Sequence, residues 1–110
     1  LVVQVENPAG LEALDDLLLV EGVDAVFIGP SDLSANMGYI GNPSAPEVVA
    51  AVDDALDRIA ASDKASGIMA LDPAAAKAYL DRGVDFVAVS IDARTLALSL
   101  RALAAEMRDR

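Results

Sequence analysis

Two acidic side chains follow the first two hydrophobic runs of the chain, where predicted strands end. Glu6 comes directly after the Val-rich run 1–5, and Asp32 follows the run Ala25–Ile28 after the dipeptide Gly29-Pro30. Because the carboxyl ends of neighbouring parallel strands lie at one edge of a sheet, we expect the two carboxylates to converge there. Carboxylates without His or Cys nearby are hard oxygen ligands that suit Mg²⁺ or Mn²⁺, with water and substrate oxygens completing the shell.

Structural roles are the alternatives to this metal-site hypothesis. Glu6 could be a charge at a helix start, where it interacts favourably with the helix dipole. Asp32 could cap a short helix over residues 33–37. Asp72 and Asp92 are predicted to be helix caps, since each precedes an Ala- or Leu-rich run.

The segment Phe27–Ser34, with the sequence FIGPSDLS, has the features of an anion site. Gly29 allows close approach of a ligand to the backbone, and Pro30 fixes the turn. The N–H groups of Ser31 and Asp32 would then open a helix and face a carboxylate. Beside a metal held by two carboxylates, this arrangement suits a 2-oxo acid whose enolate the metal stabilises. An anion site without catalysis is the other interpretation.

The composition excludes several classes of protein. The 110 residues carry 8 Lys plus Arg and 18 Asp plus Glu, a formal net charge of −10, with no Cys and no His. Such a chain has no disulfide framework, no thiol nucleophile, no Ser-His-Asp triad and no zinc site of the usual kind. The acidic balance argues against nucleic-acid binding. No apolar run approaches the roughly 20 residues that cross a bilayer, so we expect a soluble, cytoplasmic protein.

Short β-branched runs alternate with longer Ala- and Leu-rich runs, which is typical of parallel βα units in an α/β protein. The Val-rich first run predicts a strand buried on both faces. Two architectures fit: an open doubly wound sheet, and the C-terminal half of a (β/α)₈ barrel of about 250 residues. The start of the chain within a strand favours the half-barrel, with residues 1–110 forming about four βα units. Strands are predicted over residues 1–5, 25–28, 65–70 and 84–90, with helices opening at Asn7-Pro8, near Glu47, at Asp72-Pro73 and at Asp92.

Two segments carry a resemblance to a known family. They are VQVE at residues 3–6 and GVDAVFIGPSDLS at residues 22–34, of which the GPSDLS block is the most specific. Shorter matching segments follow in order at 37–38, 41–43, 46–48, 64–68 and 83–89. Together they resemble the class II pyruvate aldolases of the HpcH/HpaI family, which include 2,4-dihydroxyhept-2-ene-dioate aldolase and 2-keto-3-deoxy sugar-acid aldolases.

The resemblance implies a (β/α)₈ barrel of which this chain is the C-terminal half. It implies a metal-dependent aldolase that cleaves 4-hydroxy-2-oxo acids to pyruvate and an aldehyde. Glu6 and Asp32 would hold the divalent metal, for which Mg²⁺, Mn²⁺ and Co²⁺ are candidates. The residues implied to contact or surround pyruvate are Gly29, Pro30, Ser31 and Met69.

The resemblance also implies what this chain lacks. The general base of the family is a His paired with an Asp, and an Arg polarises the keto group; all three lie upstream, so we expect the chain alone to be inactive. Family members form hexamers from dimers that exchange the last helix, which here begins at Asp92. The segment 7–10 departs from close relatives and leaves the subfamily open. The alternatives are a free-standing α/β anion-binding module and a half-barrel that serves only in assembly.

Overall fold

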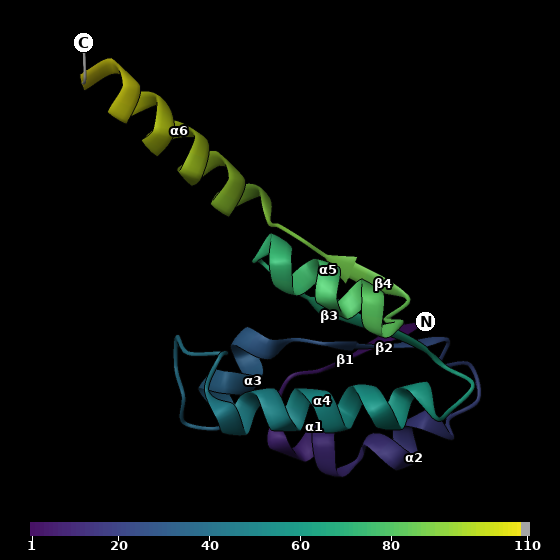
Figure 1. Ribbon diagram of the computed structural model, residues 1–110. Coiled ribbons are helices and arrows are strands. Elements are labelled where there is room, and N and C mark those ends of the chain that lie inside the picture. Colours follow the sequence, from purple (N-terminus) through teal and green to yellow (C-terminus); the bar gives the residue numbers. More distant parts are fainter. Residues whose placement is uncertain (109–110) are drawn as a thin grey trace.

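The computed structural model describes residues 1–108, and its strands form one parallel sheet (Figure 1). Residues 109–110, the end of the predicted domain 1–110, lie outside the described part of the chain. The strands are neighbours in the order in which they follow one another in the sequence. They are β1 (Val2–Val5), β2 (Ala25–Ile28), β3 (Ala65–Met69) and β4 (Phe86–Ala88).

The strand order distinguishes between the two predicted architectures. A doubly wound sheet reverses its strand order at a switch point and carries helices on both faces. Here the order is sequential, and right-handed crossovers that all advance in one direction place the connecting helices on the same face. This is the wall of a (β/α)₈ barrel, whose helices lie outside while the other sheet face points inward.

The predicted N-caps Asn7 and Asp72 are found at the starts of α1 and α5. The Asn7 side chain accepts a hydrogen bond from the Gly10 N–H at 2.8 Å, and Asp72 caps α5 in the same way. The single helix predicted after β1 is divided at Ala13, and Gly83 ends α5 with a left-handed φ of 98°. The helices are α1 (Pro8–Glu12), α2 (Leu14–Leu18), α3 (Pro30–Asn36), α4 (Pro46–Ala60), α5 (Pro73–Arg82) and α6 (Asp92–Arg108).

The hydrophobic core lies between the sheet and the helices α2, α3 and α4. Alternate strand residues point into it, as the two-residue period of a strand requires, and Val5, Ile28 and Ile68 are among its buried side chains. The helices contribute Leu14, Leu18, Leu33, Val48, Val52, Leu56 and Ile59.

The opposite face of the sheet is open. The prediction that β1 is buried on both faces is wrong, because Val2 and Gln4 are exposed where no helix covers them. On this face Phe27 of β2 and Phe86 of β4 stack across Gly67 of β3, with ring centroids 5.6 Å apart. In a (β/α)₈ barrel, inward side chains of alternate strands share one layer, and these two rings come from alternate strands.

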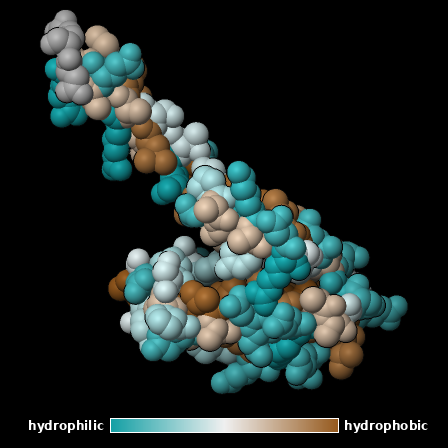
Figure 2. Space-filling view, in the orientation of Figure 1, coloured by the Kyte–Doolittle hydropathy of each residue, from teal (hydrophilic) through white to brown (hydrophobic). Residues whose placement is uncertain are grey.

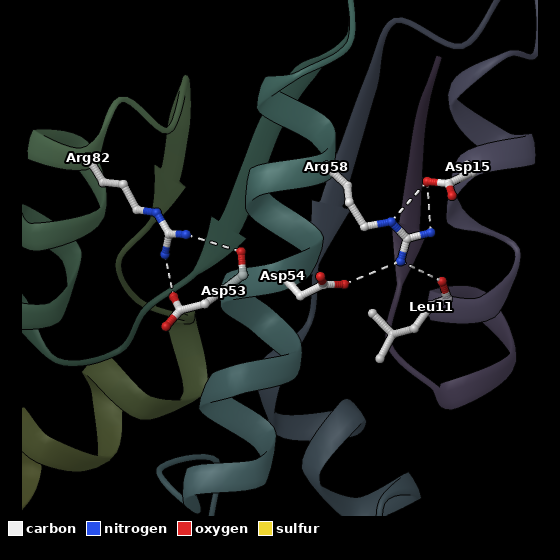
Figure 3. Close-up of polar contacts among 6 residues, drawn as sticks. All are labelled: Leu11, Asp15, Asp53, Asp54, Arg58 and Arg82. Atoms are coloured by element: carbon white, nitrogen blue, oxygen red, sulfur yellow. Dashed lines mark hydrogen bonds and ion pairs between the residues drawn. The ribbon is translucent and has the colours of Figure 1, made fainter.

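Two arginines connect α4 to its neighbours (Figure 3). Arg58 donates from Nε to Asp15 Oδ1 at 2.9 Å and from Nη1 to the Leu11 carbonyl at 3.1 Å. Arg82 of α5 pairs with the Asp53 carboxylate and donates to the Asp53 carbonyl at 3.1 Å. These contacts fix the helical layer that supports the strands.

The last helix stands apart from this body. Figure 1 shows α6 extending away from the sheet, and none of its residues is buried. Figure 2 shows apolar residues, in brown, exposed along it. Among residues 1–108, no helix is both long and apolar enough to cross a membrane. The exposed large apolar side chains of α6 are Leu96, Leu98, Leu100, Leu103 and Met107.

Asp85, just before β4, holds the strand to its neighbour. Its Oδ2 accepts hydrogen bonds from the Ser66 N–H at 2.7 Å and the Ser66 hydroxyl at 3.0 Å. These bonds, the backbone one first, lower the pKa of the Asp85 carboxyl. A carboxyl whose pKa is lower in the folded state stabilises the fold above its unfolded pKa of about 3.9. That stabilisation is lost as the pH falls through the folded value.

We therefore expect Asp85→Asn to lower the free energy of unfolding at pH 7, and the difference from wild type to shrink as the pH falls below about 4. Urea unfolding of the full-length protein across this pH range measures both quantities. Asp81→Asn, at an exposed position on α5, is the control that leaves the profile unchanged. A difference that stays constant into acid would contradict the assignment.

Candidate functional site

The carboxyl edge of the sheet carries a pocket of about 210 Å³. It receives residues from the ends of β2 and β3 and from the start of α3, which the sequential strand order brings to one edge. Of the predicted site residues, Gly29, Pro30, Ser31, Asp32 and Met69 line it. Phe27, from the predicted anion-site segment Phe27–Ser34, also lines it, and the lining residues that the sequence did not indicate are Gln4, Leu71 and Ile91.

Glu6 lies beside this pocket and is not one of its lining residues. It follows β1 directly and is half-buried, and its Oε2 accepts a hydrogen bond from Gln4 Nε2 at 2.6 Å. Gln4, which donates this hydrogen bond, does line the pocket. The two-residue spacing along a strand was the signal that could have identified Gln4 as its neighbour.

Gly29 provides the space for these two side chains. Its N–H donates to the Val5 carbonyl at 3.1 Å, which brings the ends of β1 and β2 together. A Cβ at this position would lie 2.9 Å from Gln4 Nε2 and 3.4 Å from Glu6 Oε2. Any larger residue would therefore displace the amide that holds the Glu6 carboxylate.

Asp32 is in the first turn of α3, with its side chain exposed at the pocket. The alternative that Asp32 caps a helix is wrong, because α3 already begins at Pro30 with Gly29 as its N-cap. Asn36, one turn later, donates from Nδ2 to the carbonyls of Asp32 at 2.9 Å and of Glu6 at 3.2 Å. This amide fixes the backbones of the two acidic residues relative to each other.

The arrangement supplies two carboxylates and the open first turn of a helix. Among residues 1–108 there is no group of three or more His, Cys, Asp or Glu side chains that could hold a metal. An oxygen-preferring divalent cation is commonly held by one or two carboxylates, with water and substrate oxygens filling the other positions. Glu6 and Asp32 therefore fit a cation of the Mg²⁺ type that shares its shell with a ligand.

The comparisons with known proteins agree in one assignment. Residues 1–98 match the family described as HpcH/HpaI aldolase/citrate lyase. A hydroxypyruvate/pyruvate aldolase of Pseudomonas aeruginosa is 54% identical over 108 residues, covering 98% of this chain and 40% of the relative. A 4-hydroxy-2-oxo-heptane-1,7-dioate aldolase of Escherichia coli is 51% identical over 104 residues, covering 94% of this chain and 40% of the relative.

The fold agrees with this similarity. The crystal structure of a HpcH/HpaI aldolase/citrate lyase family protein from Burkholderia cenocepacia J2315 matches with a TM-score of 0.89 at 34% identity. The match covers 97% of this chain and 42% of that protein. The chain thus spans about two fifths of the length of the proteins it matches, and the predicted class of parallel βα units is confirmed. On its sequence and its fold alike, this chain belongs to the HpcH/HpaI aldolase/citrate lyase family.

Proposed function

We propose that the protein containing this chain is a cytoplasmic, metal-dependent pyruvate aldolase. This lyase would cleave a 4-hydroxy-2-oxo acid to pyruvate and an aldehyde. The supporting observation is the pocket at the carboxyl edge of the sheet, where Gly29, Ser31, Asp32 and Met69 meet beside Glu6 in a chain of an aldolase family.

Glu6 and Asp32 are the proposed protein ligands of a divalent metal, Mg²⁺, Mn²⁺ or Co²⁺. When bound, such a metal supplies Lewis-acid stabilisation of the negative charge that develops on a substrate oxygen. Gln4 orients Glu6 through the 2.6 Å hydrogen bond to its carboxylate. Asn36 holds the backbones of the two proposed ligands at a fixed position relative to each other, because it donates hydrogen bonds to both of their carbonyls.

The start of α3 is the proposed site for the pyruvate carboxylate. The first turn of a helix leaves backbone N–H groups without partners inside the helix, and Ser31 and Asp32 occupy this turn. Pro30 fixes the direction of the turn, and Gly29 keeps the backbone accessible. Met69, at the end of β3, supplies an apolar wall for the methyl end of pyruvate.

Proton transfer must come from residues outside this chain. The chain contains no His, the side chain whose ordinary pKa lies near neutral pH, and Asp32 carries the one carboxylate among the residues that line the pocket. We assign residues 1–110 to the C-terminal half of the barrel, and expect the remaining half to cover the open sheet face and to carry the base. The isolated chain is accordingly expected to be inactive.

Assembly is the proposed role of α6. The exposed leucines of α6 favour contact with a partner surface, because moving apolar side chains out of water lowers the free energy. We propose that α6 packs on a second copy of the chain, as in a hexamer of dimers that exchange this helix.

Removal of the metal tests the proposed function in the full-length protein. EDTA is expected to lower kcat/KM for cleavage of a 4-hydroxy-2-oxo acid by about 100-fold or more, because Lewis-acid stabilisation contributes several kcal/mol. Adding Mg²⁺, Mn²⁺ or Co²⁺ in excess restores it, and EDTA saturated with Mg²⁺ beforehand is the control. Cleavage that persists after exhaustive chelation would refute metal dependence, whereas pyruvate binding without any cleavage would favour the anion-binding module.

A further inference from the structure

A second pocket, of about 290 Å³, adjoins the first. It lies among the loop before α4, the start of α5 and the start of α6, so it opens after β3 and β4. The residues that line both pockets are Pro30, Ser31, Met69 and Leu71. The two pockets therefore lie side by side at the same edge of the sheet.

Arg94 is the cation of this second pocket. Of the basic side chains, Arg58, Lys64 and Arg82 are each paired with a carboxylate. Within residues 1–108, no carboxylate lies within ion-pairing distance of Arg94. Its guanidinium is available to an incoming anion.

Asp72 is the one acidic residue among those that line the second pocket, and it is the N-cap of α5. The Asp72 carboxylate accepts a hydrogen bond from the Ala75 N–H at 2.8 Å as the cap of α5. The remaining polar side chains of the lining are the hydroxyls of Ser31, Ser44 and Tyr79, which can donate hydrogen bonds. Burial raises the pKa of the Tyr79 phenol, so this hydroxyl keeps its proton at neutral pH.

One guanidinium and three hydroxyl groups around the second pocket favour a carboxylate or a phosphate, which Arg binds with paired hydrogen bonds. In (β/α)₈ barrels, the loops after the last two strands frequently bind phosphate groups. The guanidinium and the hydroxyl groups of the lining therefore favour an anion in the second pocket, in keeping with this tendency of the fold.

We infer that the second pocket receives the anionic end of the aldehyde partner, and that Arg94 determines the preference for it. This inference rests on the proposed aldolase function: if the pyruvate part of the substrate occupies the first pocket, the aldehyde part extends from it into an adjoining space. Substrates whose aldehyde part ends in a carboxylate or phosphate are then favoured over neutral ones of the same length.

The experiment compares pairs of aldehydes in pyruvate condensation by the full-length protein. Succinic semialdehyde is paired with pentanal, and glyceraldehyde 3-phosphate with glyceraldehyde, so that each pair differs in its anionic group. Arg94→Gln is expected to lower kcat/KM for the anionic member by about tenfold or more, as loss of a hydrogen bond to a charged group does. The neutral member is expected to change less than about twofold, by the same reasoning.

Two variants serve as controls. Arg94→Lys keeps the charge and is expected to recover part of the preference. Arg101→Gln removes a charge from the same helix at an exposed position that lines neither pocket, and is expected to leave the preference unchanged. The pair that responds more strongly identifies the anion as carboxylate or phosphate.

An equal loss on both members of each pair, or no loss on either, would overturn the inference. If wild type condenses no aldehyde at all, the proposed function fails, and the pocket is then judged by calorimetric binding of succinate and of inorganic phosphate. Binding that Arg94→Gln weakens tenfold and Arg101→Gln does not would still support an anion site. Absence of binding to wild type would overturn it.

Discussion

Glu6→Gln is expected to lower kcat/KM of the full-length protein for the proposed aldol cleavage by about 1,000-fold or more, and to weaken binding of the proposed divalent metal to a similar degree. The substitution removes the charge and keeps the shape of the side chain. Its amide oxygen can still accept the hydrogen bond from Gln4, and it still fits beside Gly29. The loss therefore reports the carboxylate as a metal ligand and not the packing around it.

The measurement has two parts. Calorimetric titration with Mn²⁺ gives the Kd, and steady-state kinetics at saturating Mn²⁺ give the residual kcat. The thermal unfolding midpoint without metal is expected to stay within a degree or two of wild type, since exposed and half-exposed substitutions change stability little. Glu12→Gln, an exposed carboxylate on α1, is the matched control. Wild-type Mn²⁺ affinity in Glu6→Gln would remove Glu6 from the metal site.

The local pattern of the chain was sufficient to predict most of the fold. The strand over Ala25–Ile28 was predicted with the observed ends, because a buried hydrophobic run stops at Gly29-Pro30, and Pro is excluded from the interior of a central strand. The strand predicted over 84–90 is shorter, Phe86–Ala88, because β4 pairs only with β3 in this chain. Strand length at a sheet edge depends on a neighbour, which the local sequence does not contain.

The positions of the two acidic residues could be predicted from the sequence, whereas the residues around them could not. The position of each acidic residue after a strand placed Glu6 and Asp32 at one edge, and the parallel sheet has them there. Asn36 and Gln4 were not predicted, since their roles depend on hydrogen bonds between segments far apart in sequence, such as the one from Asn36 to the Glu6 carbonyl. Arg94 was missed for a similar reason: its place in the second pocket depends on the loop before α4 and on α5, which lie far from it in the sequence.

Gly67→Ala is expected to destabilise the full-length protein by about 2–3 kcal/mol, as overpacking of a close-packed layer does. A Cβ on Gly67 would lie 2.2 Å from Cζ of Phe86 and 2.5 and 2.6 Å from its two Cε atoms, distances that no real contact shows. The Phe86 ring must move, although it is stacked with the ring of Phe27. Because Phe27 lines the first pocket, kcat/KM is expected to fall along with the thermal unfolding midpoint.

The Phe86→Ala background separates the steric cause from any backbone effect. Gly67 does not have a positive φ, so Ala fits its backbone and by itself would restrict the unfolded chain, a gain of up to about 1 kcal/mol. With the ring removed, Gly67→Ala is therefore expected to be neutral or slightly stabilising, and the double-mutant cycle to show a coupling of about 2 kcal/mol or more. Urea unfolding of the four proteins measures this coupling. If Gly67→Ala costs the same in both backgrounds, Phe86 does not approach Gly67 in the assembled protein. If the coupling is found, the small residue of β3 is what allows aromatic side chains of β2 and β4 to meet in one layer beneath the site.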